Sequence, residues 1–131
     1  MENNSIPSMD EWLREAKADE SAPKIGMYLV HNGVVRGTAK AMVRRGEKDT
    51  LPVKGMEFSY DPESLERLRA DTLKMDGIYY IRAWLNSGVL KTGDDLMYVL
   101  IGGDIRPHVV DALQFFVGTV KEKIVKEYEM F

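Results

Sequence analysis

Two segments of the chain combine apolar residues at helical spacing with residues that typically begin a helix. Residues 8–17 begin with Ser8, which is followed three residues later by a glutamate, the spacing of a capping box. Residues 61–77 begin with Asp61, a typical N-cap, and Pro62, a favoured first helical residue, and their apolar stripe runs up to a glycine. Both segments are therefore predicted to contain a helix with one apolar face.

The longest apolar stripe lies in the last part of the chain. Asp104 is the expected cap of this helix, and Pro107 suits its first turn. Steps of three and four residues connect the members of the stripe: Val109, Leu113, Phe116, Val117, Val120 and Ile124. The body of this helix is predicted to lie in the core. Arg106 falls at its N-terminus, where backbone N–H groups and the helix dipole favour an anion.

Four other segments have the composition of strands. Residues 24–37 are rich in β-branched and aromatic residues around an Asn-Gly pair, which predicts a strand with a turn or bulge. Residues 55–60 and 78–88 also predict strands. Residues 94–103 are almost continuously apolar, as is typical of a strand buried on both faces.

The order of these elements predicts an α+β domain with a mainly antiparallel sheet and packed helices. Its 131 residues suit one domain with one core. Residues 1–7 are polar, and we expect them to be disordered. Residues 37–55 are rich in Lys and Arg and show little periodicity, which predicts a mobile hairpin or flap. This segment is either a solvated hairpin tip or a basic cover over an anionic ligand.

The overall charge and the absence of cysteine narrow the function. Eighteen basic and 21 acidic residues give a net charge of −3, which does not favour binding to nucleic acid or to an anionic membrane. Without cysteine the chain has no disulfide, no thiolate metal site and no catalytic thiol. The N-terminus lacks a signal-peptide pattern, and no run of apolar residues is long enough to span a membrane. We therefore expect a cytoplasmic protein.

Known catalytic and metal motifs are absent from the sequence. His31 and His108 are far apart and fit no common metal-ligand spacing, so we predict no metal and no cofactor. His31 is interpreted as a structural residue on or beside a strand. The Gly-Gly-Asp at residues 102–104 lacks the spacing and the lysine of a P-loop.

The remaining candidate chemistry is cationic. Arg36 follows a strand, Arg44 and Arg45 lie in the basic segment, and Arg106 begins a helix. Lys121, Lys123 and Lys126 come late in the last helix, where interaction with the helix dipole also explains them. The residues by themselves indicate a small α+β domain with a local anion pocket.

Four motifs in the same order resemble the MoaE family, the large subunit of molybdopterin synthase. The segment "GMYLVHNGVVRG" resembles the family's strand ending in Gly-x-Val-Arg, and "MEFSYDPESLERL" its Leu-Glu-x-Tyr strand and the helix that follows. The segment "NSGVLKTGDDLMYVLIGG" is similar to its next strand pair, and "RPHVVDALQFFVGTVK" to the helix that ends in its first catalytic lysine. The resemblance covers about residues 25–126.

This resemblance implies an α/β hammerhead fold with an additional antiparallel sheet. It also implies a transferase that moves sulfur from a small-subunit thiocarboxylate to cyclic pyranopterin monophosphate in molybdenum cofactor biosynthesis. The thiocarboxylate lies on the C-terminal Gly-Gly tail of a ubiquitin-like MoaD-type subunit. Family members are homodimers with one small subunit at each end.

Individual roles follow from the positions that match the family. Arg36 and Arg106 would hold anionic groups of the substrate, for which guanidinium groups are suited. Lys121 matches the first catalytic lysine, and His108 is a candidate for the space of a histidine that the family has at position 105.

Two positions depart from the family pattern. Ile105 replaces that histidine, and Tyr128 stands where the family has its second lysine. Lys126 can replace this lysine only if the helix has already unwound. These departures leave open an alternative, a MoaE-like binding protein that keeps the fold and the partner groove without the chemistry.

Overall fold

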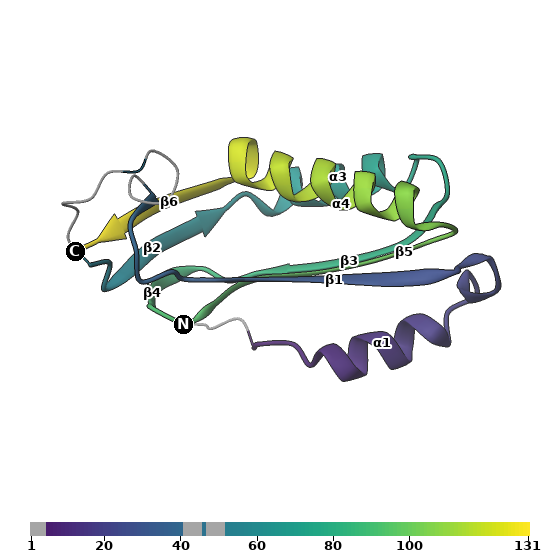
Figure 1. Cartoon of the computed structure of the whole chain (residues 1–131), viewed down its shortest axis with the longest axis horizontal. Coiled ribbons are helices and arrows are strands. Elements are labelled where there is room, and N and C mark those ends of the chain that lie inside the picture. The colour runs from purple at the N-terminus through teal and green to yellow at the C-terminus, as the bar shows by residue number, and fades with distance from the viewer. Residues whose placement is uncertain (1–4, 41–45, 47–51) are drawn as a thin grey trace.

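The computed structural model describes residues 5–40, 46 and 52–131 (Figure 1). Its helical elements are α1 (Met9–Lys17), η1 (Ala22–Lys24), α3 (Pro62–Thr72), α4 (Arg106–Thr119) and the π-helical turn η2 (Val120–Ile124). Its strands are β1 (Met27–Val34), β2 (Gly55–Tyr60), β3 (Ile78–Leu85), β4 (Gly88–Lys91), β5 (Asp95–Gly103) and β6 (Val125–Met130). The predicted α+β class with antiparallel sheets is confirmed.

The main sheet has the order β1-β5-β3, with both pairs antiparallel. In Figure 1 it forms the middle layer, with α1 on one face and α3 and α4 on the other. The strand β5 is central, and its almost continuous burial confirms the prediction made from its apolar run. The bulge predicted near the Asn-Gly pair occurs between Gly33 and Val34 at the end of β1.

Apolar side chains fill both faces of this sheet. On the α3 and α4 side they form the larger core, in which Phe58, Phe116 and Ile101 are almost completely buried. On the α1 side, Trp12 and Ala16 pack with Leu100 of β5. The predicted apolar stripe of the last helix is therefore core. Burial of these faces supplies the main driving force for folding.

The starts of α1 and α3 follow the sequence signals, whereas the end of α3 differs from them. Ser8 caps α1, since its hydroxyl accepts a hydrogen bond from the Glu11 N–H at 3.3 Å. The helix α3 ends at Thr72, before the end of its apolar stripe. The turn that follows contains Gly77 at a φ of +76°, where a Cβ atom would lie 2.2 Å from the Asp104 carboxylate. Only glycine fits this position without strain.

A second antiparallel sheet has the order β4-β2-β6, in agreement with the additional sheet that the family resemblance implies, but the local patterns did not predict its strands β4 and β6. The strand β4 begins at the last residue of the predicted strand at residues 78–88, and β6 follows directly after η2. The prediction that the last element is a helix is therefore wrong. The strand β6 pairs with β2 along its whole length, from Tyr60 opposite Val125 to Gly55 opposite Met130. The second sheet lies at one end of the main sheet, beside the end of α4 (Figure 1).

Among the described residues, no helix is long and apolar enough to cross a membrane. Most of the predicted flap, and the start of the predicted disordered lead-in, lie outside the described residues. The described ends of the basic segment are joined, since the Val53 N–H donates to the Gly37 carbonyl at 3.0 Å.

Candidate functional site

A small cavity of about 70 Å³ lies where the end of β1, the turn η2 and the strand β6 come together. Its wall contains three cations, two carboxylates and three apolar side chains: Arg36, Lys40, Lys121, Glu127, Glu129, Val34, Met56 and Leu96. Arg36 and Lys121, two residues that the motifs predicted as substrate-binding and catalytic, thus line the same cavity.

Arg36 is held at the cavity by the residues around it. The neighbouring Val35 is almost completely buried, and its N–H donates to the Asp94 carbonyl at 2.9 Å. Successive side chains of an extended segment point in opposite directions, so Arg36 points outward. Its Nε donates to the Thr38 carbonyl at 3.0 Å, and its two terminal nitrogens have no carboxylate partner among the described residues.

Lys121 is positioned by the π-helical turn that ends α4. Val120 and Ile124 at the ends of this turn are buried in the core, and Lys121 between them is exposed to the cavity. A single π turn of this kind is often found at functional sites. Within the described part of the chain, Lys121 has no carboxylate partner.

His31 lies on β1 and has a lowered pKa. Burial is the larger cause, and the positive charge of Lys121 is the second. The Nε2 atom of His31 is buried and has no hydrogen-bond partner among the described residues. The sequence correctly placed His31 on a strand but did not indicate its proximity to Lys121.

Three further charged residues of the cavity were missed by sequence reasoning. Glu127 and Glu129 are alternate residues of β6, so they lie on the same face of the strand. Lys40 forms an ion pair through Nζ with Oε1 of Glu127. Its backbone N–H donates to Oε2 of Glu129 at 3.1 Å. The alternation of residues in "VKEYEM" indicates which side chains share one face of a strand. It could not be used to find these residues, because the segment was not predicted to be a strand.

Lys126 and Tyr128 lie on the opposite face of β6. Lys126 lines a separate cavity of about 650 Å³ between β6 and the start of α3. Tyr128 is 63% exposed. The helix has unwound before Lys126, which is the condition we set for Lys126 to act beside Lys121. The strand nevertheless directs it into a different cavity, so the structure does not bring Lys121 and Lys126 together.

Arg106 and His108 lie at the start of α4, far from Lys121. The helix is 14 residues long, so about 20 Å separates its two ends. The His108 Nδ1 lies 2.7 Å from the Asp104 carboxylate, which also accepts from the Ile105 N–H at 2.6 Å. These hydrogen bonds, first the one with His108, hold the Asp104 pKa below its usual value. His108 therefore fixes the helix start.

The identity of the helix cap differs from the prediction. Ile105 is the N-cap residue, and Asp104 precedes it. Arg106 is exposed at the first helical position, as predicted. Arg44 and Arg45 lie outside the described residues.

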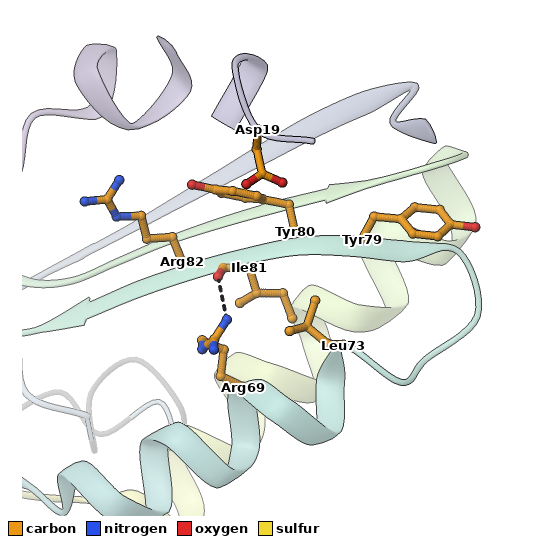
Figure 2. Close-up of a pocket in the computed structure, with 7 residues that line it drawn as sticks. All are labelled: Asp19, Arg69, Leu73, Tyr79, Tyr80, Ile81 and Arg82. Atoms are coloured by element: carbon orange, nitrogen blue, oxygen red, sulfur yellow. Dashed lines mark hydrogen bonds between the residues drawn. The ribbon is translucent and has the colours of Figure 1, made fainter. Parts of the chain in front are cut away.

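A hollow of about 340 Å³ beside the edge strand β3 also contains arginines (Figure 2). Arg69 is engaged by Glu66, at 2.9 Å between Nη2 and Oε2, and by the Ile81 carbonyl. Arg82 pairs with Glu15 and stacks over the Trp12 ring. Since both guanidinium groups already have partners, this hollow is not preferred as an anion site. No group of three or more potential metal ligands occurs among the described residues.

The fold and the cavity define an α+β protein with a cationic site at the junction of two antiparallel sheets. The chain belongs to the MoaE protein family, whose model matches residues 7–123. The predicted family membership is thereby confirmed. A comparison with curated protein sequences gives no match.

Solved structures of this family share the fold. Molybdopterin synthase from Staphylococcus aureus superposes with a TM-score of 0.72 at 18% identity, over 95% of this chain and 86% of that one. The MoaE protein from Burkholderia ambifaria gives a TM-score of 0.70 at 18% identity, over 98% and 81% of the two chains. A complex of subunits 1 and 2 of the molybdopterin-converting factor from Helicobacter pylori gives 0.64 at 16% identity, over 94% and 78%. These similarities establish the architecture.

Proposed function

We propose that this chain acts as the large subunit of a molybdopterin synthase in the cytoplasm. In this role it transfers sulfur from the C-terminal thiocarboxylate of a small subunit to cyclic pyranopterin monophosphate. The observation that carries the proposal is that Arg36 and Lys121 line one cavity. Family membership supports the same role. The absence of cysteine fits a reaction in which a partner supplies the sulfur.

The roles of the two residues follow from their chemistry. The terminal nitrogens of Arg36, which have no carboxylate partner among the described residues, are suited to an anionic group of the substrate. The Lys121 ammonium stabilises the negative charge that develops while the thiocarboxylate reacts. The thiocarboxylate sulfur forms a C–S bond to the pterin side chain and displaces an oxygen of the cyclic phosphate. Water then cleaves the acyl C–S bond, so the sulfur stays on the pterin and the small-subunit tail leaves as a carboxylate. The charge of a fixed cation acts more strongly in a cavity of low dielectric constant than in bulk water.

The proposed assembly has a small ubiquitin-like partner and a second copy of this chain. The Helicobacter pylori structure is a complex of two subunits, which supports a small-subunit partner here. Arg106 is about 20 Å from Lys121 along α4, so one chain cannot bring the two to one substrate. In the proposed homodimer, Arg106 reaches the cavity of the other copy.

A binding protein without catalysis is the second candidate. Two carboxylates, Glu127 and Glu129, line the proposed anion site and favour this function. Ile105 and Tyr128 also favour it, because the family has a histidine and a lysine at these positions. Such a protein would still bind the small-subunit tail.

A reconstituted assay separates these functions. Purified protein is mixed with a thiocarboxylated MoaD-type subunit and cyclic pyranopterin monophosphate, and molybdopterin is measured as its fluorescent oxidation product. Formation of product supports the enzyme. A stable complex with the small subunit but no product supports the binding protein, and absence of both excludes the two functions together.

A further inference from the structure

The second lysine of this site is not where the sequence pattern suggests. The family pattern assigns it to position 128, which is a tyrosine here, and Lys126 was the nearest substitute. Both side chains lie on the face of β6 opposite to the cavity. The cavity nevertheless contains a second lysine, Lys40, which comes from the segment after β1.

Lys40 is held at the cavity from both of its ends. Its backbone N–H donates to the Glu129 carboxylate, at 3.1 Å from Oε2 and 3.4 Å from Oε1. Its Nζ pairs with Glu127, whose side chain is only 17% exposed. The preceding residue, Ala39, is 2% exposed and anchors the backbone in the core. A long flexible side chain is thereby restricted to one direction, which reduces the entropy lost when a ligand binds.

The ion pair with Glu127 does not prevent Lys40 from acting on a substrate. An ammonium has three N–H donors, and Glu127 accepts from one of them. No other ion pair of this Nζ occurs among the described residues, so the ammonium can also bind an anionic group in the cavity.

The charges of the cavity support this assignment. Glu127 is paired with Lys40, and Glu129 accepts a hydrogen bond from its backbone. Arg36 and Lys121 have no carboxylate partner within the described residues. Among the described residues, the wall therefore carries three cations and two carboxylates, and both carboxylates are directed at Lys40. This arrangement explains why acidic residues occur in a site for anions.

We propose that Lys40 is the second catalytic lysine of this chain, with Glu127 and Glu129 as its positioning residues. The ammonium groups of Lys40 and Lys121 together stabilise the charge that develops during sulfur transfer. This inference rests on the proposed function and adds to it a residue from outside the matching motifs. The role is electrostatic, and no proton leaves the lysine.

The absence of cysteine permits a direct test. Lys40→Cys introduces the only thiol of the chain, and it is alkylated before the small subunit is added. Reaction with 2-bromoethylamine restores an ammonium at nearly the same reach, whereas iodoacetamide attaches a neutral group of similar size. We expect the unmodified variant to lose about 100-fold in kcat, the loss typical of one electrostatic group. Aminoethylation should restore most of it, and the neutral group should not.

Three further variants complete the experiment. Lys91→Cys changes an exposed lysine of β4 and should keep its activity whether it is unmodified, aminoethylated or treated with iodoacetamide. Lys126→Cys tests the competing residue directly. Glu127→Gln should lower kcat without changing the affinity for the small subunit. Thermal unfolding and small-subunit binding, measured for each sample, separate loss of chemistry from loss of fold.

The outcomes distinguish this inference from the function on which it rests. Active wild-type protein with a fully active unmodified Lys40→Cys would overturn the role of Lys40 alone. The role of Lys40 would also be overturned if the two alkylated forms of Lys40→Cys recovered the same kcat. It would likewise be overturned if aminoethylation raised kcat only in Lys126→Cys. Wild-type protein that binds the small subunit without forming product would overturn the proposed function, and the role of Lys40 with it.

Discussion

The positive charge of Lys121 acts on His31, and it lowers the pKa of this histidine in addition to the effect of burial. His31 lies in the main sheet, and Lys121 lies in the turn that ends α4. The two residues therefore report on whether α4 is correctly packed over β1, and on whether Lys121 faces the cavity.

Replacing Lys121 with a neutral residue should raise the pKa of His31. In Lys121→Gln the nearby charge is removed, so the imidazolium form is less disfavoured. Burial is the larger cause and remains, so the pKa should stay below the usual value of about 6.5. NMR titration of the two histidines measures this, with His108→Asn to assign the signals. Lys123→Gln is the matched control, because Lys123 lines a different cavity. An unchanged His31 pKa in Lys121→Gln would show that Lys121 points elsewhere.

The lowered His31 pKa should also make stability depend on pH. The folded protein disfavours the charged imidazole, so the unfolded chain binds the proton first as the pH falls. The free energy of unfolding should therefore be highest above about pH 6.5 and should decrease from there toward the lower pKa of the folded state. His31→Gln should remove this part of the decrease. Urea unfolding of both proteins at several pH values is the measurement, and parallel curves would contradict the prediction.

Restoring a lysine at position 128 should not increase turnover. Tyr128 is 63% exposed and lies on the face of β6 that does not line the cavity. In Tyr128→Lys the new ammonium would extend into solvent, away from Lys121. The measured kcat should stay within about twofold of the wild-type value, as for other exposed positions outside a site. A large gain would show that position 128 can reach the substrate.

Two inactive variants should complement each other if Arg106 acts across the homodimer. Lys121→Ala and Arg106→Ala should each strongly lower turnover. After the two are unfolded together and refolded, half of the dimers are mixed, and each mixed dimer has one intact site, so about a quarter of the sites recover. Activity that does not recover, in dimers shown to be mixed by mass spectrometry, would place Arg106 outside the site.

The sequence predicted the parts of the structure that local patterns determine. The Ser8 cap, the Asp61-Pro62 helix start and the burial of β5 follow from capping chemistry and apolar patterning. Arg36 and Lys121 were found through the order of the motifs, and the structure brings them together.

The parts that were missed depend on pairing between distant segments. Ile124 continues the helical spacing of the stripe, yet the chain leaves the helix after Thr119 because β6 can pair with β2. This pairing decides which residues of β6 face the cavity. It directs Glu127 inward and Lys126 outward, and no local pattern indicates that Lys40 meets Glu127.

The most direct test of the central claim compares Lys121→Ala with the wild type in the reconstituted sulfur-transfer assay. The account predicts that the wild type forms molybdopterin, and that Lys121→Ala keeps its fold and its small-subunit complex but loses at least about 100-fold in turnover. Full turnover by Lys121→Ala would contradict the assignment of this cavity as the site of sulfur transfer.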